Sequence, residues 1–168
     1  MNKQLETDLE ELSQRTEVFE GLENSIFLIT GSTGLIGSLL IKSLLTYSRK
    51  KNANIKVYAL CRSDNKFNSV FADFLGSDLI PVFADLLSFD QKKIDFSIDY
   101  IIHGAAITTS KDMVEHAVET LDTAYIGTRN ILSLAKEKKI KSMVYLSSME
   151  VYGITDSSLN YVIEKDLG

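Results

Sequence analysis

The sequence predicts an α/β protein in which a doubly wound parallel sheet carries helices on both faces. Short continuous apolar runs alternate with longer stretches whose apolar residues recur at helical spacing. A glycine-rich stretch, 30-TGSTGLIG-37, joins the first apolar run to the first of these helical stretches. The chain has 168 residues, 45% of them hydrophobic, which suffices for one domain with a buried core.

The first 22 residues predict an amphipathic helical extension that precedes the sheet. The helical pattern runs from about Lys3 to Phe19 on a mostly charged segment, and its leucines recur at helical spacing: Leu5, Leu9 and Leu12. The pattern allows this helix to pack on its own domain or to bind a partner. Packing on the same chain is the favoured interpretation.

Residues 23–168 predict the sheet and its helices. Five strands are expected, over Ile26–Ile29, Ile55–Cys61, Leu79–Ala84, Asp99–His103 and Met143–Ser147. A long helix is expected over Asp112–Lys138, between the fourth and fifth strands. Strands that alternate with helices indicate right-handed βαβ crossovers and therefore a parallel sheet.

Composition excludes several classes of function. A net charge of −5 and a sequence pI near 5.1 provide no basic field for nucleic acid or for an anionic membrane. The single cysteine, Cys61, cannot form an internal disulfide and fits a reducing compartment. The acidic N-terminus does not resemble a signal peptide, and no long apolar run occurs. We therefore expect a cytoplasmic protein that binds neither nucleic acid nor membrane, and we expect no metal site.

The three glycines, Gly31, Gly34 and Gly37, stand on the predicted strand-to-helix turn. One would permit the tight turn, one the close approach of a ligand, and one the packing of helix against strand. Backbone N–H groups at the start of a helix favour an anion such as a pyrophosphate. The alternative is a turn that binds nothing. The expected cradle comprises Gly31, Ser32, Thr33, Gly34, Leu35, Ile36 and Gly37.

Further site residues are expected just after each strand, because ligands of open parallel sheets bind beyond the carboxyl ends of the strands. The second strand leads into 61-CRSD-64 and the third into Asp85. The fourth leads into 104-GAAITTSK-111 and the fifth into 147-SSMEVYG-153.

This set of segments resembles the NAD(P)-dependent epimerase/dehydratase family, which belongs to the extended short-chain dehydrogenases/reductases. The resemblance covers nearly all of the chain after residue 25 and rests on 30-TGSTGLIG-37, 83-FADL-86, 103-HGAA-106, 127-GT-128 and 145-YLSSMEVYG-153. It implies a Rossmann-type domain that holds NAD or NADP, followed by a smaller part that holds a nucleotide sugar.

The resemblance assigns cofactor contacts to several residues. Asp85, with Leu86 beside it, would accept a hydrogen bond from the adenine amino group, although an aspartate after a strand can equally cap a helix. Ala105 and Ala106 would line the pyrophosphate and nicotinamide, although tight packing also demands small residues.

The residues after the second strand bear on the choice between NAD and NADP. Cys61 stands where NAD enzymes of the family usually carry a carboxylate for the ribose, and Arg62 follows it. A guanidinium suits a 2′-phosphate, which favours NADP. Two alternatives stay open: Asp64 could reach the ribose, or Arg62 could simply be solvated.

The resemblance also implies two catalytic residues. Ser148 lies four residues before Tyr152 and would hydrogen-bond the reacting oxygen of the sugar. Glu150 lies where dehydratase and decarboxylase relatives carry an acid/base carboxylate, but it could also be an exposed loop charge. Met149 stands where dehydratases have an aspartate, which argues against their complete reaction.

The chain departs from the family at the catalytic Tyr-x-x-x-Lys pair. Tyr161 and Lys165 have the right spacing but follow Ser148 too closely, so the true pair is expected beyond Gly168. Ala124 replaces an asparagine that usually precedes the GT pair. These departures predict the N-terminal fragment of a nucleotide-sugar epimerase, dehydratase or decarboxylase, inactive alone and prone to self-association or dimerisation. The alternatives are a non-catalytic dinucleotide-binding sensor and an NADP-dependent reductase of small carbonyl compounds.

Overall fold

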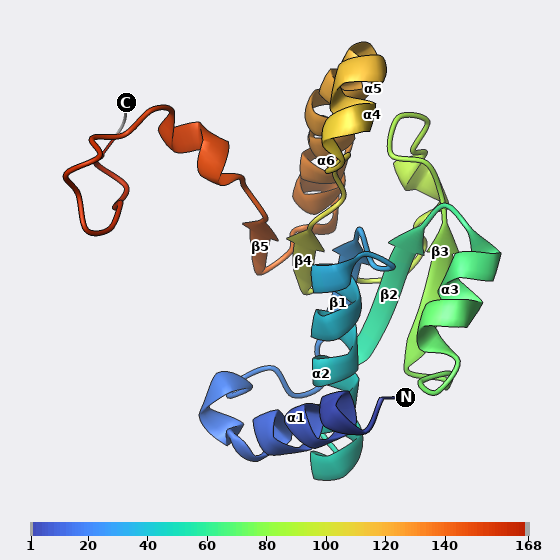
Figure 1. The fold of residues 1–168 in the computed structure, drawn as a ribbon. Helices are drawn as coiled ribbons and strands as arrows, with labels where there is room; N and C mark the ends of the chain where they lie inside the picture. Colours follow the sequence, from blue (N-terminus) through green and yellow to red (C-terminus); the bar gives the residue numbers. More distant parts are fainter. Residues whose placement is uncertain (1, 167–168) are drawn as a thin grey trace.

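The fold is a single five-stranded parallel sheet with helices on both sides (Figure 1). The computed structural model describes residues 2–166. The strands lie in the order β3-β2-β1-β4-β5, and all neighbours pair in parallel. Their bounds are β1 Ile26–Thr30, β2 Lys56–Cys61, β3 Leu79–Phe83, β4 Tyr100–His103 and β5 Ser142–Tyr145. The winding reverses between β1 and β4, so the predicted doubly wound, Rossmann-type sheet is confirmed.

The helices form two layers. The α-helices are α1 Lys3–Gln14, α2 Leu35–Lys51, α3 Asp64–Phe71, α4 Ser110–Glu115, α5 Ala117–Asp122 and α6 Thr128–Lys138. Shorter 3₁₀ turns are η1 Thr16–Val18, η2 Gln91–Lys93 and η4 Met149–Tyr152, and η3 Thr123–Gly127 is a π-helix. In Figure 1, α2 lies on one side of the sheet and α6 on the other.

Each face of the sheet has its own apolar core because alternate residues of a strand point to opposite faces. Phe27 and Ile29 of β1 belong to the core shared with α2 and α3, and Leu28 belongs to the core that contains Ile131 and Leu134 of α6. All five of these residues are buried. Burial on both faces explains why the strands appear in the sequence as nearly continuous apolar runs.

The fifth strand is shorter at its carboxyl end than the sequence predicted. We expected it to reach Ser147, but β5 ends at Tyr145. Tyr145 is the register partner of His103, the last residue of β4, and the backbone N–H of Leu146 donates to the carbonyl of His103. Beyond that point β4 offers no further residue to pair with, so the ladder stops.

The helix expected over Asp112–Lys138 is interrupted. Helix α4 begins at Ser110, after Thr109 caps it by accepting the backbone N–H of Asp112. His116, with φ −128° and ψ 50°, separates α4 from α5. A π-helical turn then ends at Gly127, where an added Cβ would lie 3.2 Å from the Cβ of Leu86. The apolar periodicity alone did not reveal these breaks.

The N-terminal helix lies against the last turns of α2. Phe19 stacks on Tyr47, with ring centroids 4.2 Å apart and planes at 10°. Glu10 accepts a hydrogen bond from the ammonium of Lys50 at 2.7 Å. Leu9 and Phe19 are each only 4% exposed and belong to the core on the α2 face. Helix α1 ends at Gln14, earlier than expected, and η1 carries the chain on to Phe19.

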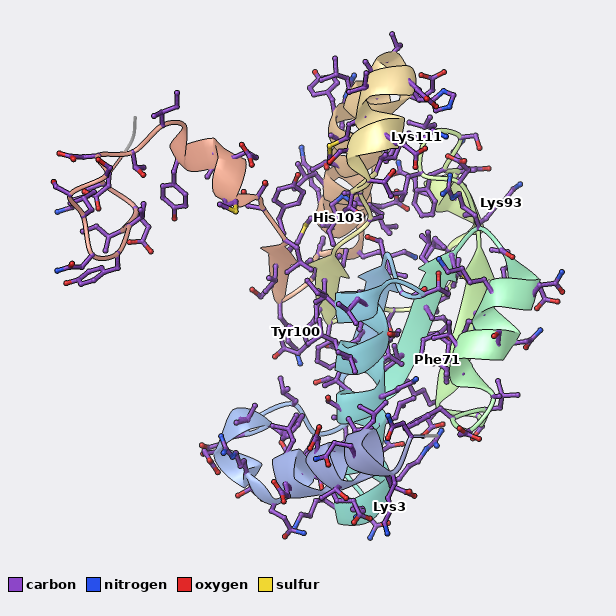
Figure 2. The ribbon with its side chains drawn as sticks, viewed as in Figure 1. Lys3, Phe71, Lys93, Tyr100, His103 and Lys111 are labelled. Atoms are coloured by element: carbon purple, nitrogen blue, oxygen red, sulfur yellow. The ribbon has the colours of Figure 1, made fainter. Side chains whose placement is uncertain are left out.

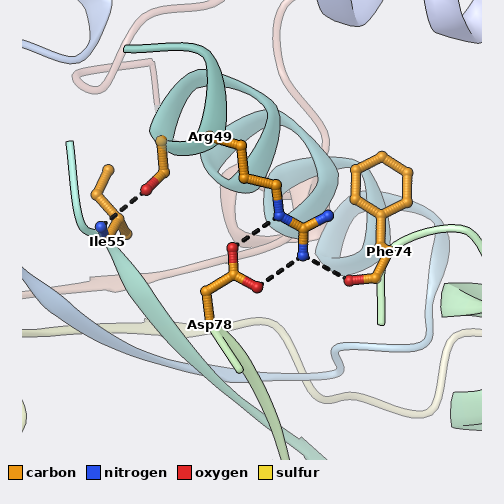
Figure 3. A network of polar contacts seen from close by, with 5 residues as sticks. Arg49, Ile55, Phe74 and Asp78 are labelled. Atoms are coloured by element: carbon orange, nitrogen blue, oxygen red, sulfur yellow. Dashed lines mark hydrogen bonds and ion pairs between the residues drawn. The ribbon is translucent and has the colours of Figure 1, made fainter. Parts of the chain in front are cut away.

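A second contact fixes the other side of the same end of α2 (Figure 3). The Arg49 guanidinium donates to both carboxylate oxygens of Asp78, at 2.7 and 2.6 Å, and to the carbonyl of Phe74 at 2.6 Å. The hydroxyl of Ser48 accepts the backbone N–H of Ile55. The hydrogen bonds that Arg49 donates to the Asp78 carboxylate are the largest cause of the lowered pKa of Asp78. The end of α2 remote from the glycine turn is therefore tied to the chain that enters β2 and β3.

We predict that Phe19→Ala lowers the free energy of unfolding by about 3–5 kcal/mol, because it leaves a cavity beside Tyr47 and removes a buried ring. Val18→Ala is the matched control, since Val18 is 55% exposed, and should change stability by less than about 0.5 kcal/mol. Urea unfolding followed by circular dichroism measures both variants. Equal stabilities for the two would show that the extension does not support the sheet.

Candidate functional site

The glycine turn leaves β1 and starts α2 without a side-chain cap. The N–H of Gly34 donates to the carbonyl of Gly31 at 2.9 Å, and Gly34 takes the cap position of α2 with extended backbone angles. Within residues 2–166 no side chain makes a cap hydrogen bond at this helix start. Leu35, 79% exposed, and Ile36, 56% exposed, leave the first turn open to solvent. The first backbone N–H groups of α2 are thus available to an anion.

Two of the glycines are required by close backbone contacts. Gly31 has φ +65°, and a Cβ on it would lie 2.5 Å from the carbonyl oxygen of Gly104. A Cβ on Gly37 would overlap the carbonyl of Gly31, so this glycine lets the helix pack on the turn. The turn after β1 and the loop after β4 therefore touch at the point where the winding of the sheet reverses.

The residue between these glycines has a structural role. Ser32 is fully buried, and its hydroxyl donates to the carbonyl of Leu60 at 2.9 Å. Its side chain is therefore committed to β2, and only its backbone can serve a ligand at the turn. Thr33 is partly buried.

The residues after β2 differ in character. Cys61 is buried, and burial raises the pKa of its thiol, which therefore stays neutral near pH 7. Arg62 is exposed, and within residues 2–166 no carboxylate pairs with it. Ser63 caps α3, and the carboxylate of Asp64 accepts a hydrogen bond from Asn68 at 2.8 Å. Arg62 is thus the free charged group at this strand end.

The residues after β3 form the edge of a hollow. Asp85 accepts the backbone N–H of Leu87 at 2.8 Å, so one carboxylate oxygen stabilises a turn rather than a helix. Leu86 is buried, and its carbonyl accepts a hydrogen bond from the side chain of Asn130 at 2.7 Å. A hollow of about 430 Å³ opens here, lined by Val82, Phe83, Ala84, Asp85, Ser88, Phe89, Asp90, Lys93 and Ile94. Lys93 is labelled in Figure 2.

Sequence reasoning missed a buried polar group beneath these loops. The hydroxyl of Thr30 lies 2.6 Å from Nδ1 of His103, and Nε2 of His103 lies 3.1 Å from the hydroxyl of Thr128. His103 is labelled in Figure 2. Thr30 also accepts the backbone N–H groups of Gly104 and Ala105, at 3.2 and 3.1 Å. The sequence did contain an indication of this group, because a polar residue ends each of two apolar strands, Thr30 in β1 and His103 in β4. Ala105 is partly buried and Ala106 exposed.

The two residues expected to be catalytic lie apart from this site. Ser148 caps η4 by accepting the backbone N–H of Glu150, and both residues are exposed. Within residues 2–166, the hydrogen bonds of the segment 147–166 all stay inside that segment. Figure 1 shows this segment projecting away from the sheet. Tyr161 and Lys165 lie in it without helical structure, so they do not share a helix face.

A parallel sheet with an uncapped helix start at its switch point defines a dinucleotide-binding fold. The family model described as "NAD dependent epimerase/dehydratase family" matches residues 27–166, and the chain belongs to that family. Residues 2–26, with α1, lie before the match.

Curated relatives support this membership. The chain is 31% identical over 137 residues to a dTDP-D-glucose 4,6-dehydratase of Dictyostelium discoideum, covering 75% of this chain and 29% of the relative. It is 30% identical over 126 residues to a UDP-N-acetyl-alpha-D-glucosaminuronate decarboxylase of Bacillus cytotoxicus, covering 75% of this chain and 37% of the relative. The chain thus spans well under half of each relative.

Solved structures agree with the fold. A UDP-glucuronic acid 4-epimerase mutant from Bacillus cereus, in complex with a fluorinated UDP-glucuronic acid and NAD, matches with a TM-score of 0.69 and 25% identity. The match covers 84% of this chain and 45% of the epimerase. A dTDP-glucose 4,6-dehydratase from Streptomyces venezuelae with NAD bound matches with a TM-score of 0.64 and 26% identity, over 79% of this chain and 42% of the dehydratase. Among the described residues, no helix combines the length and apolarity that a membrane span needs.

We predict that Gly31→Ala destabilises the protein by about 1–3 kcal/mol more than Gly21→Ala, because its Cβ collides with the backbone of Gly104. Gly21 is a matched control: its φ is +79°, so alanine is strained there too, but nothing lies within 4 Å of its Cβ. Thermal unfolding by circular dichroism compares the two variants. Equal losses would refute the close contact between the turn and the loop after β4.

Proposed function

We propose that residues 23–168 are the cofactor domain of an NAD(P)-dependent nucleotide-sugar epimerase, dehydratase or decarboxylase, and that residues 1–22 are a helical extension of it. The observation that carries the proposal is the uncapped start of α2 at the switch point between β1 and β4. Free N–H groups and the positive end of the helix dipole suit a pyrophosphate there. The named relatives act on nucleotide sugars, which supports the substrate class.

The glycine turn fits a dinucleotide because Gly31 and Gly37 let the turn and α2 pack closely on neighbouring backbone, while no side-chain cap covers the first N–H groups of α2. When bound, the nicotinamide would take a hydride from a carbon of the sugar. The chain's own part is to hold the pyrophosphate at Gly34–Ile36 and to place the loop of Ala105 and Ala106 beside the nicotinamide. One carboxylate oxygen of Asp85 accepts the backbone N–H of Leu87, and the other would accept a hydrogen bond from the adenine amino group.

Ser148 and Glu150 are proposed to act on the sugar, Ser148 by hydrogen-bonding its reacting oxygen and Glu150 as an acid/base. Their segment exposes a series of apolar side chains, Met149, Val151, Ile154 and Tyr161. Such exposure supports the docking of further protein against it. We therefore propose that the native protein continues past Gly168 and carries the Tyr-x-x-x-Lys pair there.

Self-association and a cytoplasmic location complete the proposal. Apolar side chains on α4, α5 and η3 are 69–81% exposed: Val114, Val118, Leu121 and Tyr125. A surface of this kind favours a homodimer. Sedimentation velocity of the native protein tests the dimer, and a monomer at micromolar concentration would contradict it.

Fractionation of the source cell tests the proposed cytoplasmic location, and recovery of the protein in a secreted fraction would contradict it.

For the cofactor, we propose NADP over NAD, on the strength of Arg62 alone. We predict that the protein binds NADP more tightly than NAD and that Arg62→Ala weakens NADP binding about tenfold while leaving NAD binding unchanged, because the guanidinium contacts the 2′-phosphate. Lys66→Ala, an exposed cation on the neighbouring helix, is the matched control. Isothermal titration calorimetry measures both cofactors. Tighter binding of NAD, or equal losses of both, would exclude this preference.

For catalysis, we predict that the native protein is longer than 168 residues and that Ser148→Ala in it lowers kcat at least about a hundredfold without changing cofactor affinity. Ser147→Ala is the control and should keep most of the activity. Intact mass of the protein from its source cell comes first, followed by turnover of UDP- and dTDP-sugars. A native chain that ends at Gly168 would contradict the enzyme hypothesis and favour the non-catalytic dinucleotide-binding sensor. Turnover of simple carbonyls alone would favour a reductase.

A further inference from the structure

The buried group of Thr30, His103 and Thr128 joins the elements that enclose the candidate dinucleotide site. Thr30 is the last residue of β1 and precedes Gly31, and His103 is the last residue of β4 and precedes Gly104. Thr128 opens α6 on the far side of the ring. Thr30 is fully buried and His103 is 1% exposed. The imidazole therefore stands below the two loops, out of reach of the ligand itself.

The hydrogen bonds determine which nitrogen of His103 carries the proton. The Thr30 hydroxyl accepts two bonds, from the N–H groups of Gly104 and Ala105, and the Gly104 N–H is shared with the Thr30 carbonyl 3.3 Å away. A hydroxyl has two lone pairs and one hydrogen, and with both lone pairs facing these N–H groups we assign its hydrogen to the bond with Nδ1 of His103. Nδ1 is then unprotonated, and the neutral ring carries its hydrogen on Nε2, which donates to Thr128.

This arrangement holds the loop after β4 against the glycine turn. With its hydrogen directed at His103, Thr30 presents both lone pairs to the backbone of Gly104 and Ala105. The same loop backbone lies where a Cβ of Gly31 would be. The direction of one hydroxyl therefore sets how closely the two loops approach across the switch point of the sheet.

We propose that His103 is a positioning residue for dinucleotide binding, which acts as the neutral Nε2–H tautomer by orienting Thr30 and thereby fixing how closely the two loops approach each other. The proposal rests on the proposed dinucleotide-binding function. His103 touches no substrate atom in this role. It acts through Thr30 on the backbone of residues 104 and 105.

Protonation of His103 would break the arrangement. An imidazolium donates from both nitrogens, so Thr30 would have to accept from Nδ1 and release one loop N–H. The groups facing the ring are Thr30 from β1, Thr128 from α6 and Tyr145 from β5, whose ring centroid is 5.6 Å away. Among residues 2–166 no carboxylate hydrogen-bonds to the ring. Burial lowers the pKa of His103 from its ordinary 6.5.

The sign of the pH effect follows from that shift. The folded chain binds the proton less readily than the unfolded chain, so acid favours the unfolded or loosened state. The stability of the fold and the affinity for the dinucleotide should both be at their maximum above about pH 6.5. Both should fall as the pH drops through the lowered pKa of His103.

Two substitutions separate orientation from packing. Asparagine keeps an acceptor near the place of Nδ1 but does not titrate, whereas leucine fills the space without an acceptor. We expect His103→Leu to weaken NAD or NADP binding at pH 7.5 about tenfold, because the hydroxyl of Thr30 loses its partner. His103→Asn should bind within about threefold of the unchanged protein at pH 7.5 and should lose the decline in affinity at pH 5.5. His116→Asn, at the chain's other, exposed histidine, is the control and should keep that decline.

The test is calorimetric titration with NAD and NADP at pH 7.5 and 5.5, with near-ultraviolet circular dichroism to confirm folding. Nitrogen-15 NMR of the ligand-free protein should show His103 protonated on Nε2 only. Absence of binding by the unchanged protein would overturn the proposed function and this role with it. Normal dinucleotide binding by His103→Leu would overturn the positioning role alone. So would a His103→Asn variant whose dinucleotide affinity still declines between pH 7.5 and 5.5. A proton on Nδ1 would do the same.

Discussion

The close contact between Gly31 and Gly104 is the constraint on which the rest of the site depends. Gly31 can come this near to the backbone of Gly104 only because it carries no side chain, and the turn after β1 and the loop after β4 leave the sheet as neighbours at the switch point. At the start of α2, Gly34 provides no side-chain cap, so the first N–H groups of the helix stay free. The sheet order thus places the site, and the glycines keep it open.

Such a contact has no hydrophobic driving force of its own and must be held by polar groups. The side chain of Thr30 supplies two of the bonds and needs His103 to direct it. Leaving any member of a buried polar group without a partner costs about 1–3 kcal/mol, so the group is useful only when complete. The remote end of α2 is held separately, by Arg49 and by the N-terminal helix. The helix is thereby fixed at both ends, which keeps its free start in a constant place.

The sequence allowed the sheet, its winding and the position of the glycine turn to be predicted, because each rests on a local pattern: apolar runs, helical spacing and glycines at a strand end. The break at His116 and the π-turn before Gly127 were not predictable from such patterns, since packing of Gly127 on Leu86 involves residues far apart in the chain. Nor was the role of Ser32, whose hydroxyl reaches a carbonyl of another strand. The pairing of Thr30 with His103 depends on register across β1 and β4, which one strand alone does not reveal.

Binding and catalysis make different demands on the chain. The residues proposed to bind the dinucleotide lie on rigid strand ends, where burial and hydrogen bonds fix their backbone, so they can be arranged by this sheet alone. Ser148 and Glu150 lie beyond the last ladder bond of β5, in a segment whose hydrogen bonds are local among the described residues. Catalytic geometry must hold within a fraction of an ångström, and a segment with only local bonds does not provide that. The apolar side chains it exposes are what a covering element would bury. On the proposed function, this sheet can arrange the cofactor site by itself, whereas the proposed sugar site would need protein packed against residues 147–166.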